Sequence, residues 1–225
     1  YGEGRPSGAG VYLESYNQTH GNWELQGWAE FGAPGVSKYS TRFFQGQRGP
    51  LMETVAYERL GMRVQTDWTR SRRHSWRVSH TGDAAGSSTW DLRYGIRTDV
   101  GRRLTASLDL RYEDRLADAQ WLDNLADPAG LDGVAYVFAA LDQQTLDVTL
   151  RTSWFFDRDT SLELYVQPYL TTGQYSRPRH LAAPDSRDLR PYELDTAPYD
   201  FDFAALNLNA VLRWEYRPGS TLFVV

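Results

Sequence analysis

The chain has 225 residues, with 24 basic and 29 acidic side chains and no cysteine. The lack of cysteine excludes a disulfide framework, a thiolate metal site and a cysteine nucleophile. The net charge of −5 is spread along the sequence without a basic block that would follow a phosphate backbone, so nucleic acid is not expected as a partner. The longest purely apolar run, Val134 to Leu141, is far shorter than the roughly 20 residues of a membrane-spanning helix.

Alternation of apolar and polar residues with period two predicts long strands with one apolar and one polar face. The first hairpin, near Val11 to Tyr16 and Trp23 to Phe31, shows this pattern least clearly. The clearer apolar sets are, in chain order, Leu60, Met62, Val64 and Trp68; Trp90, Leu92, Tyr94 and Ile96; Leu104, Ala106, Leu108, Leu110 and Tyr112; Leu146, Val148, Leu150, Trp154 and Phe156; Leu162, Leu164, Val166 and Leu170; and Leu206, Leu208, Ala210, Leu212, Trp214 and Tyr216. These segments run about ten to thirteen residues, close to the length that a tilted strand needs to cross a bilayer.

The connections between these strands alternate in length. Short turns are predicted near Arg70 to His74, Val100 to Arg102, Asp157 to Asp159 and Arg217 to Ser220, and long loops near Gly32 to Tyr57, Asp114 to Gly133 and Gln174 to Asp202. Outer-membrane barrels combine short periplasmic turns with long outer loops. We therefore predict an all-β fold, an antiparallel transmembrane β-barrel segment of about ten strands with up-and-down meander topology.

Residues 1–225 are expected to be part of a single outer-membrane barrel domain. The chain starts without a methionine or a basic-then-apolar leader, and it stops inside an apolar stretch. Both features are typical of a C-terminal fragment of a longer protein.

Aromatic residues gather where the strands meet the short turns. An aromatic girdle is predicted from Trp68, Trp154, Phe156, Trp214 and Tyr216, because amphipathic rings favour the membrane interface. The alternative is that these rings belong to the core of a soluble sandwich. Pro168 falls on the apolar face of its strand, where it removes a ladder donor, so a bulge or local break is expected there.

The polar faces of the predicted strands carry both signs of charge. The predicted lumen-lining residues are Asp91, Arg93, Arg97, Asp109, Arg111, Glu113, Asp147, Arg151, Glu163, Arg213 and Glu215. In a wide barrel they would line a wet channel, whereas the simpler interpretation is that they pair across neighbouring strands. A channel selective for one sign of ion is not indicated.

No catalytic residue, metal ligand or cofactor is predicted. The four histidines lack the i, i+4 spacing of zinc hydrolases, and the sequence has neither a glycine-rich phosphate loop nor a Gly-x-Ser-x-Gly elbow. The acidic loops supply oxygen ligands of the kind that Ca²⁺ prefers but lack the fixed spacing of a calcium loop, so solvated loops are favoured. Leu116, Trp121, Leu122 and Leu125 are interpreted as a short amphipathic helix that caps a loop.

Three motifs in the last 90 residues carry a family resemblance. They are the run from Tyr136 to Leu146, the run from Leu162 to Tyr169, and the run from Leu212 to Val224. Together they resemble an uncharacterised family of bacterial outer-membrane proteins in which a barrel of unknown function follows a domain similar to family 9 carbohydrate-binding modules. The resemblance implies a bacterial outer-membrane location, outer-membrane lipid as a partner, and carbohydrate as a partner only through that preceding domain. It supplies no catalytic residues.

Three hypotheses for function follow. The first is a non-catalytic outer-membrane barrel that serves as a pore or as a carbohydrate-associated surface platform. The second is a soluble all-β carbohydrate-binding module, and the third is a membrane-embedded hydrolase acting on glycans. A paired-carboxylate hydrolase would need two carboxyl groups about 5 to 10 Å apart, and Asp109 and Glu163 are the residues to test.

Overall fold

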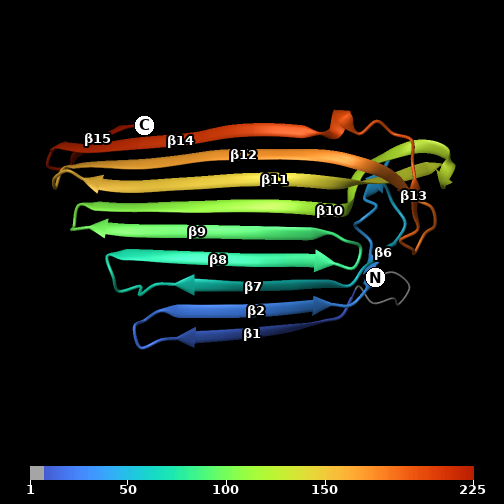
Figure 1. Cartoon of the computed structure of the whole chain (residues 1–225). Coiled ribbons are helices and arrows are strands. Elements are labelled where there is room, and N and C mark those ends of the chain that lie inside the picture. Colours follow the sequence, from blue (N-terminus) through green and yellow to red (C-terminus); the bar gives the residue numbers. More distant parts are fainter. Residues whose placement is uncertain (1–7) are drawn as a thin grey trace.

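The computed structural model describes residues 8–225, which form one large antiparallel sheet and two small two-stranded sheets near one end of it (Figure 1). Strands of the large sheet follow one another in the order β1-β2-β7-β8-β9-β10-β11-β12-β14-β15, and β13 pairs with β12. The predicted all-β antiparallel meander is confirmed at this level. β1 and β15 are the two edges of the sheet and do not pair with each other.

The large sheet consists of β1 (Gly10–Gln18), β2 (Glu24–Gly32), β7 (Tyr57–Gln65), β8 (Arg72–Asp83), β9 (Ser88–Val100), β10 (Leu104–Leu131), β11 (Val134–Phe155), β12 (Thr160–Leu181), β13 (Leu189–Pro191), β14 (Phe201–Arg217) and β15 (Ser220–Val224). The small sheets pair β3 (Gly35–Ser37) with β6 (Met52–Thr54) and β4 (Phe43–Phe44) with β5 (Gln47–Arg48). Helical structure in residues 8–225 is limited to the 3₁₀ turn η1 (Ala197–Tyr199), and no helix there is long and apolar enough to cross a membrane.

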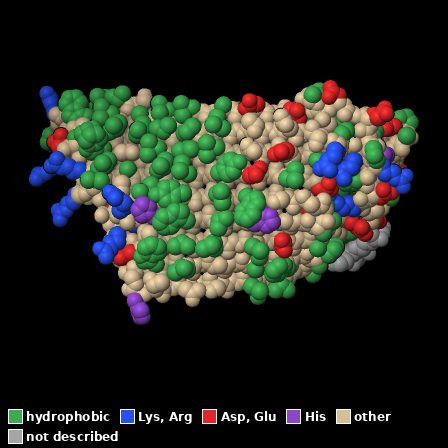
Figure 2. Space-filling model, viewed as in Figure 1, with side chains coloured by type: hydrophobic (Ala, Val, Ile, Leu, Met, Phe, Trp, Pro, Cys, Tyr) green, Lys and Arg blue, Asp and Glu red, His purple; other side chains and the backbone are tan. Residues whose placement is uncertain are grey.

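One face of β10, β11, β12 and β14 is apolar over the half nearest the turns that join β9 to β10, β11 to β12 and β14 to β15. Successive side chains of a strand point to opposite faces, so pairing register decides which side chains become neighbours. Leu108 of β10 lies opposite Ile96 of β9 and Leu150 of β11. Figure 2 shows the face where hydrophobic side chains gather. Basic side chains lie at its left edge, where the short turns are. Within residues 8–225 no second layer covers this face, and Leu206 and Leu208 are each 66% exposed.

The predicted loop from Asp114 to Gly133 is wrong. β10 continues through it to Leu131 and meets β11 in a two-residue turn, Asp132-Gly133, in which both residues have positive φ (52° and 78°). Turns of this kind match the twist of the flanking strands, which explains the Asp-Gly pair. The short helix predicted around Trp121 is therefore also wrong, because those residues are in β10.

The predicted loop from Gln174 to Asp202 is only partly correct, because β12 extends to Leu181 before the chain leaves the sheet. The connection from Gly32 to Tyr57 is long as predicted and contains β3 to β6. The predicted difference between short turns at one end of the sheet and long loops at the other arises mainly because β10, β11 and β12 extend beyond the regular sheet at the second end. A short turn over residues 84–87 joins β8 to β9 at the same end as the long connections (Figure 1).

Bulges occur where β10 extends beyond the regular sheet. Its register with β11 shifts between Ala117 and Gln120, between Trp121 and Asp123, and between Ala126 and Leu131. Such shifts bend and twist the strand locally. Pro168 produces no bulge, because it lies opposite Leu206 of β14 in regular register. The expected local break is present on the β11 side, where pairing is interrupted at Gln167 and Pro168 and resumes in the same register.

The buried core lies at the end with the long connections. Val134, Tyr136 and Phe138 of β11 pack with Met52 and Leu181 in one cluster. The alternate residues Ala135, Val137 and Ala139 pack with Leu122 in a second cluster, with Tyr175, Tyr192, Leu194 and Tyr199 beside it. The apolar run from Val134 to Leu141 is thus explained, because both faces of β11 are buried there.

Candidate functional site on the polar face

Pairing register arranges the predicted lumen residues in transverse rows on the face opposite the apolar one. In one row Asp91 of β9 lies opposite Glu113 of β10, which lies opposite Thr145 of β11. In the next row Arg93 lies opposite Arg111, which lies opposite Asp147. The polar-face set therefore comes from neighbouring strands rather than from one loop.

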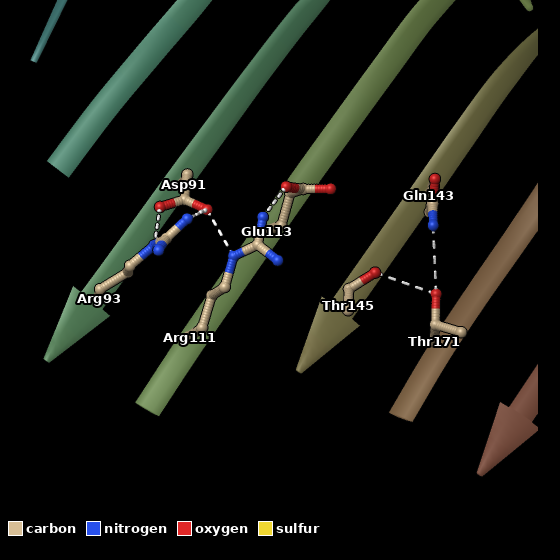
Figure 3. A network of polar contacts seen from close by, with 7 residues as sticks. All are labelled: Asp91, Arg93, Arg111, Glu113, Gln143, Thr145 and Thr171. Atoms are coloured by element: carbon tan, nitrogen blue, oxygen red, sulfur yellow. Dashed lines mark hydrogen bonds and ion pairs between the residues drawn. The ribbon is translucent and has the colours of Figure 1, made fainter. Parts of the chain in front are cut away.

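Asp91 is the centre of an ion-pair network (Figure 3). Its Oδ1 accepts a hydrogen bond of 2.6 Å from Arg93 Nε, and its Oδ2 accepts one of 2.6 Å from Arg111 Nε. Arg111 also donates from Nη2 to Glu113 Oε2 at 2.5 Å. Asp91 is only 8% exposed, and two guanidinium groups compensate the cost of placing its charge there. Here the pairing interpretation of the charges is correct.

A neutral hydrogen-bond cluster continues across β11 and β12. Gln143 Nε2 donates to Thr171 Oγ1 at 3.3 Å, and the hydroxyls of Thr145 and Thr171 lie 3.0 Å apart (Figure 3). Both threonines are buried, and each satisfies the other's hydroxyl. One row away, Gln167 Nε2 donates to Asp147 at 3.1 Å, so this predicted lumen carboxylate has a neutral partner.

Arg97, Asp109 and Arg151 line a groove of about 360 Å³ on the same face, beside Ser75 and Trp68. Arg151 lies over the ring of Tyr165, with its guanidinium carbon 5.2 Å from the ring centroid. Such stacking holds a guanidinium in place without neutralising its charge. The groove therefore keeps three arginines, with Arg73 of β8 as the third, and a carboxylate facing one open space.

The remaining predicted charges lie towards β14. Arg213 Nη2 donates to Glu215 on the same strand at 3.0 Å, whereas Glu163 is exposed and lies opposite Ser153 and Val211. Asp109 and Glu163 are two strands and four residues apart, because Asp109 pairs with Thr149 and Glu163 with Ser153. Strand spacing puts them on the order of 15 Å from each other, too far to act together on one glycosidic bond.

The predicted girdle residues lie near the short turns. Trp154 and Phe156 have ring centroids 4.6 Å apart, and those of Trp214 and Tyr216 are 6.0 Å apart. In each pair the two side chains are on the apolar face, since they alternate with Ser153 or Arg213 of the polar face. Trp68 instead lines the polar-face groove described above.

Two further arginines of the polar face, Arg63 and Arg77, are not in the predicted lumen-lining set, although alternation in its strand already places Arg63 on the polar side. They extend the row of Arg93 and Arg111, with Arg63 opposite Arg77 and Arg77 opposite Arg93. The local signal for Arg77 is short: it falls between Trp76 and Val78, which lie on the apolar face opposite Val64 and Met62. Among residues 8–225, no group of three or more histidine, aspartate or glutamate side chains is arranged to hold a metal ion.

Comparison with known families gives one match. The model of a domain of unknown function, DUF5916, matches residues 11–225. No curated protein and no solved structure matches the chain.

Proposed function

Since the chain belongs to the family of the domain of unknown function DUF5916, whose description assigns no activity, we propose a function from geometry: the sheet forms part of the wall of a transmembrane β-barrel in a bacterial outer membrane. Its apolar face contacts lipid, and its polar face lines a water-filled passage for small polar solutes. No catalytic step is part of this proposal.

The straight boundary of the apolar band is the observation that carries the proposal. On the apolar face Tyr112, Leu146, Leu170 and Ala204 lie in register across β10, β11, β12 and β14. The next positions in the same strands are Asp114, Gln144, Thr172 and Asp202, again in register with one another. A change from apolar to polar along one line across four strands is expected where hydrocarbon ends and the headgroups begin.

The width of the band also supports a membrane. Towards the short turns, Leu104, Trp154 and Leu162 lie in register with one another. Apart from Thr152, each of β10, β11 and β12 is therefore apolar on this face over about nine residues, close to the roughly 9 to 11 that a tilted strand needs to cross a bilayer. Exposed apolar patches of this extent are rare on soluble monomers and mark a surface that a membrane or another protein covers.

Single spin labels test the membrane assignment. The sequence has no cysteine, so Leu208→Cys on the apolar face and Asn207→Cys on the polar face each give one labelled site. With the protein in lipid vesicles, the label at 208 should collide with oxygen more than with a water-soluble nickel complex, and the label at 207 should show the reverse. Equal nickel accessibility at both sites would refute the lipid-facing assignment.

Conductance tests the passage separately. The whole protein in planar bilayers should give steps of ion current, because charged and polar side chains keep the polar face wet. Electrical silence combined with the expected label pattern would reject the passage while leaving the wall assignment in place.

A further inference from the structure

Four arginines form one row across the polar face. Arg63 of β7, Arg77 of β8, Arg93 of β9 and Arg111 of β10 lie directly opposite one another on consecutive strands. Like charges directly opposite in a sheet are destabilising, so a row of four is a costly arrangement for stability alone. It indicates a role other than holding the strands together.

Half of this row lacks a carboxylate partner. Arg93 and Arg111 share Asp91, whereas none of the ion pairs among residues 8–225 includes Arg63 or Arg77. Arg63 donates to the neutral Gln65 at 2.7 Å, and the guanidinium carbon of Arg77 lies 4.5 Å from the centroid of the Trp28 ring. Both guanidinium groups therefore keep donors and charge for a further partner.

Two glycines shape a cavity beside these arginines. Gly95 is buried on its floor, where an added Cβ would lie 2.7 Å from Ser75 Oγ and 3.0 Å from Asp109 Oδ1. Gly61 leaves room for the Trp28 ring, because an added Cβ there would lie 2.1 Å from Trp28 Cζ2. Trp28 thus packs over Gly61, and Arg77 stacks on Trp28. The cavity therefore depends on the absence of a side chain at Gly95, and the position of Arg77 depends on the absence of one at Gly61.

The cavity has a basic and an acidic side. Its volume is about 330 Å³, within the range of small-molecule sites, and all four arginines line it. Its other lining residues include Asp109, Asp147 and Thr149, which lie on β10 and β11. A ligand that fits would present an anion to Arg63 and Arg77 and hydrogen-bond donors to the two carboxylates.

We propose that this cavity binds a small hydroxylated organic anion of the sugar-acid class, its carboxylate held by Arg63 and Arg77 and its hydroxyls donating to Asp109 and Asp147. The inference deepens the proposed passage by naming a solute class for it, but the cavity is built from side chains of β7 to β11 alone. Binding can therefore be measured without any assumption about conduction.

Calorimetric titration of the chain in detergent micelles tests the proposal with three probes. Glucuronate should bind with a Kd of about 1 mM or tighter, and glucose, which lacks the anion, should bind at least tenfold more weakly. Inorganic phosphate, which lacks the hydroxyl array, should also bind more weakly. Equal affinity for glucuronate and glucose, or no heat with glucuronate, would overturn the site, and equal affinity for phosphate would overturn the role of the carboxylates.

Substitutions of Arg63 and Arg77 test whether the arginine row binds glucuronate. Arg63→Gln and Arg77→Gln should each weaken glucuronate binding about tenfold, the effect of losing one charge-assisted contact. Both remove like-charge repulsion, so both should fold. Arg213→Gln, on β14 and outside both the cavity and the groove beside it, is the matched control and should leave the affinity unchanged. If Arg63→Gln and Arg77→Gln bind glucuronate as tightly as the original chain does, the proposed site is wrong. The spin-label pattern at positions 207 and 208, which tests the membrane assignment, does not depend on that result.

Discussion

The two ends of the large sheet are stabilised in different ways. At the end with the long connections, β11 is buried on both faces, and Phe138 is only 2% exposed. In the half nearest the short turns none of the described residues, 8–225, forms a layer over the apolar face, and Leu208 is 66% exposed. One strand meander thus contains a region with a buried protein core and a region whose apolar residues no other part of residues 8–225 covers.

Truncating one apolar side chain in each region gives the largest expected contrast. Phe138→Ala should lower the free energy of unfolding by about 3 to 5 kcal/mol, because neighbouring side chains cannot fill the cavity that it leaves. If the proposed lipid contact holds, Leu208→Ala should cost about 1 to 2 kcal/mol, because fluid lipid would fill the space and only the transfer cost would remain. Urea unfolding of both variants in lipid vesicles measures the difference. Equal costs would show that the apolar face is packed as tightly as the core.

A polar contact holds the long connection between β2 and β7 against β10. Asn124 is 7% exposed, and its Nδ2 donates to the carbonyl oxygens of Thr41 at 2.9 Å and Phe43 at 3.2 Å. Asn124→Ala leaves both without this donor, so it should lower the free energy of unfolding by about 1 to 3 kcal/mol.

The matched control is Asn207→Ala, at an exposed position of the polar face, which should change the free energy of unfolding by less than about 0.5 kcal/mol. Proteolysis within residues 33–56 should accelerate in Asn124→Ala alone. Unchanged cleavage there would show that the contact does not hold the connection in place.

Period-two alternation predicts the strands well wherever the environment differs between the two faces. It places Leu146 to Trp154 and Leu162 to Leu170 on one face, as the pairing confirms. It fails for β10 beyond Asp114, because the bulges that follow reset the alternation and because loops cover both faces there. Asp132-Gly133 was the local signal of a hairpin at this point.

β8 was not identified as a strand for a related reason. His74 and His80 occupy apolar-face positions in it and hide the alternation, although each ring packs on that face against a tryptophan, Trp76 and Trp90 respectively. Without β8, the row that includes Arg77 cannot be assembled. The sequence therefore predicts that charges share a face but not which of them pair, because pairing depends on register and on the carboxylates within reach.

The smallest expected effect concerns the turn between β11 and β12. Asp157 Oδ1 accepts hydrogen bonds from the backbone N–H groups of Asp159 at 2.8 Å and Thr160 at 2.7 Å, and these, led by the bond from Asp159, lower the pKa of Asp157 below its ordinary value. A lowered folded-state pKa adds stability above the unfolded-state pKa of about 4, and that stability is lost as pH falls through the folded-state pKa.

Asp157→Asn should therefore unfold at slightly lower urea than the original chain at pH 7, because the amide accepts the same bonds without charge. The gap between the two midpoints should close on acidification below pH 4, since protonated aspartate then resembles the amide. Asp159→Asn, which changes a carboxyl in the same turn that accepts neither bond, is the control and should give no such pH-dependent gap. A gap for Asp157→Asn that stays constant through the acid range would mean that the hydrogen bonds stabilise the turn by geometry alone.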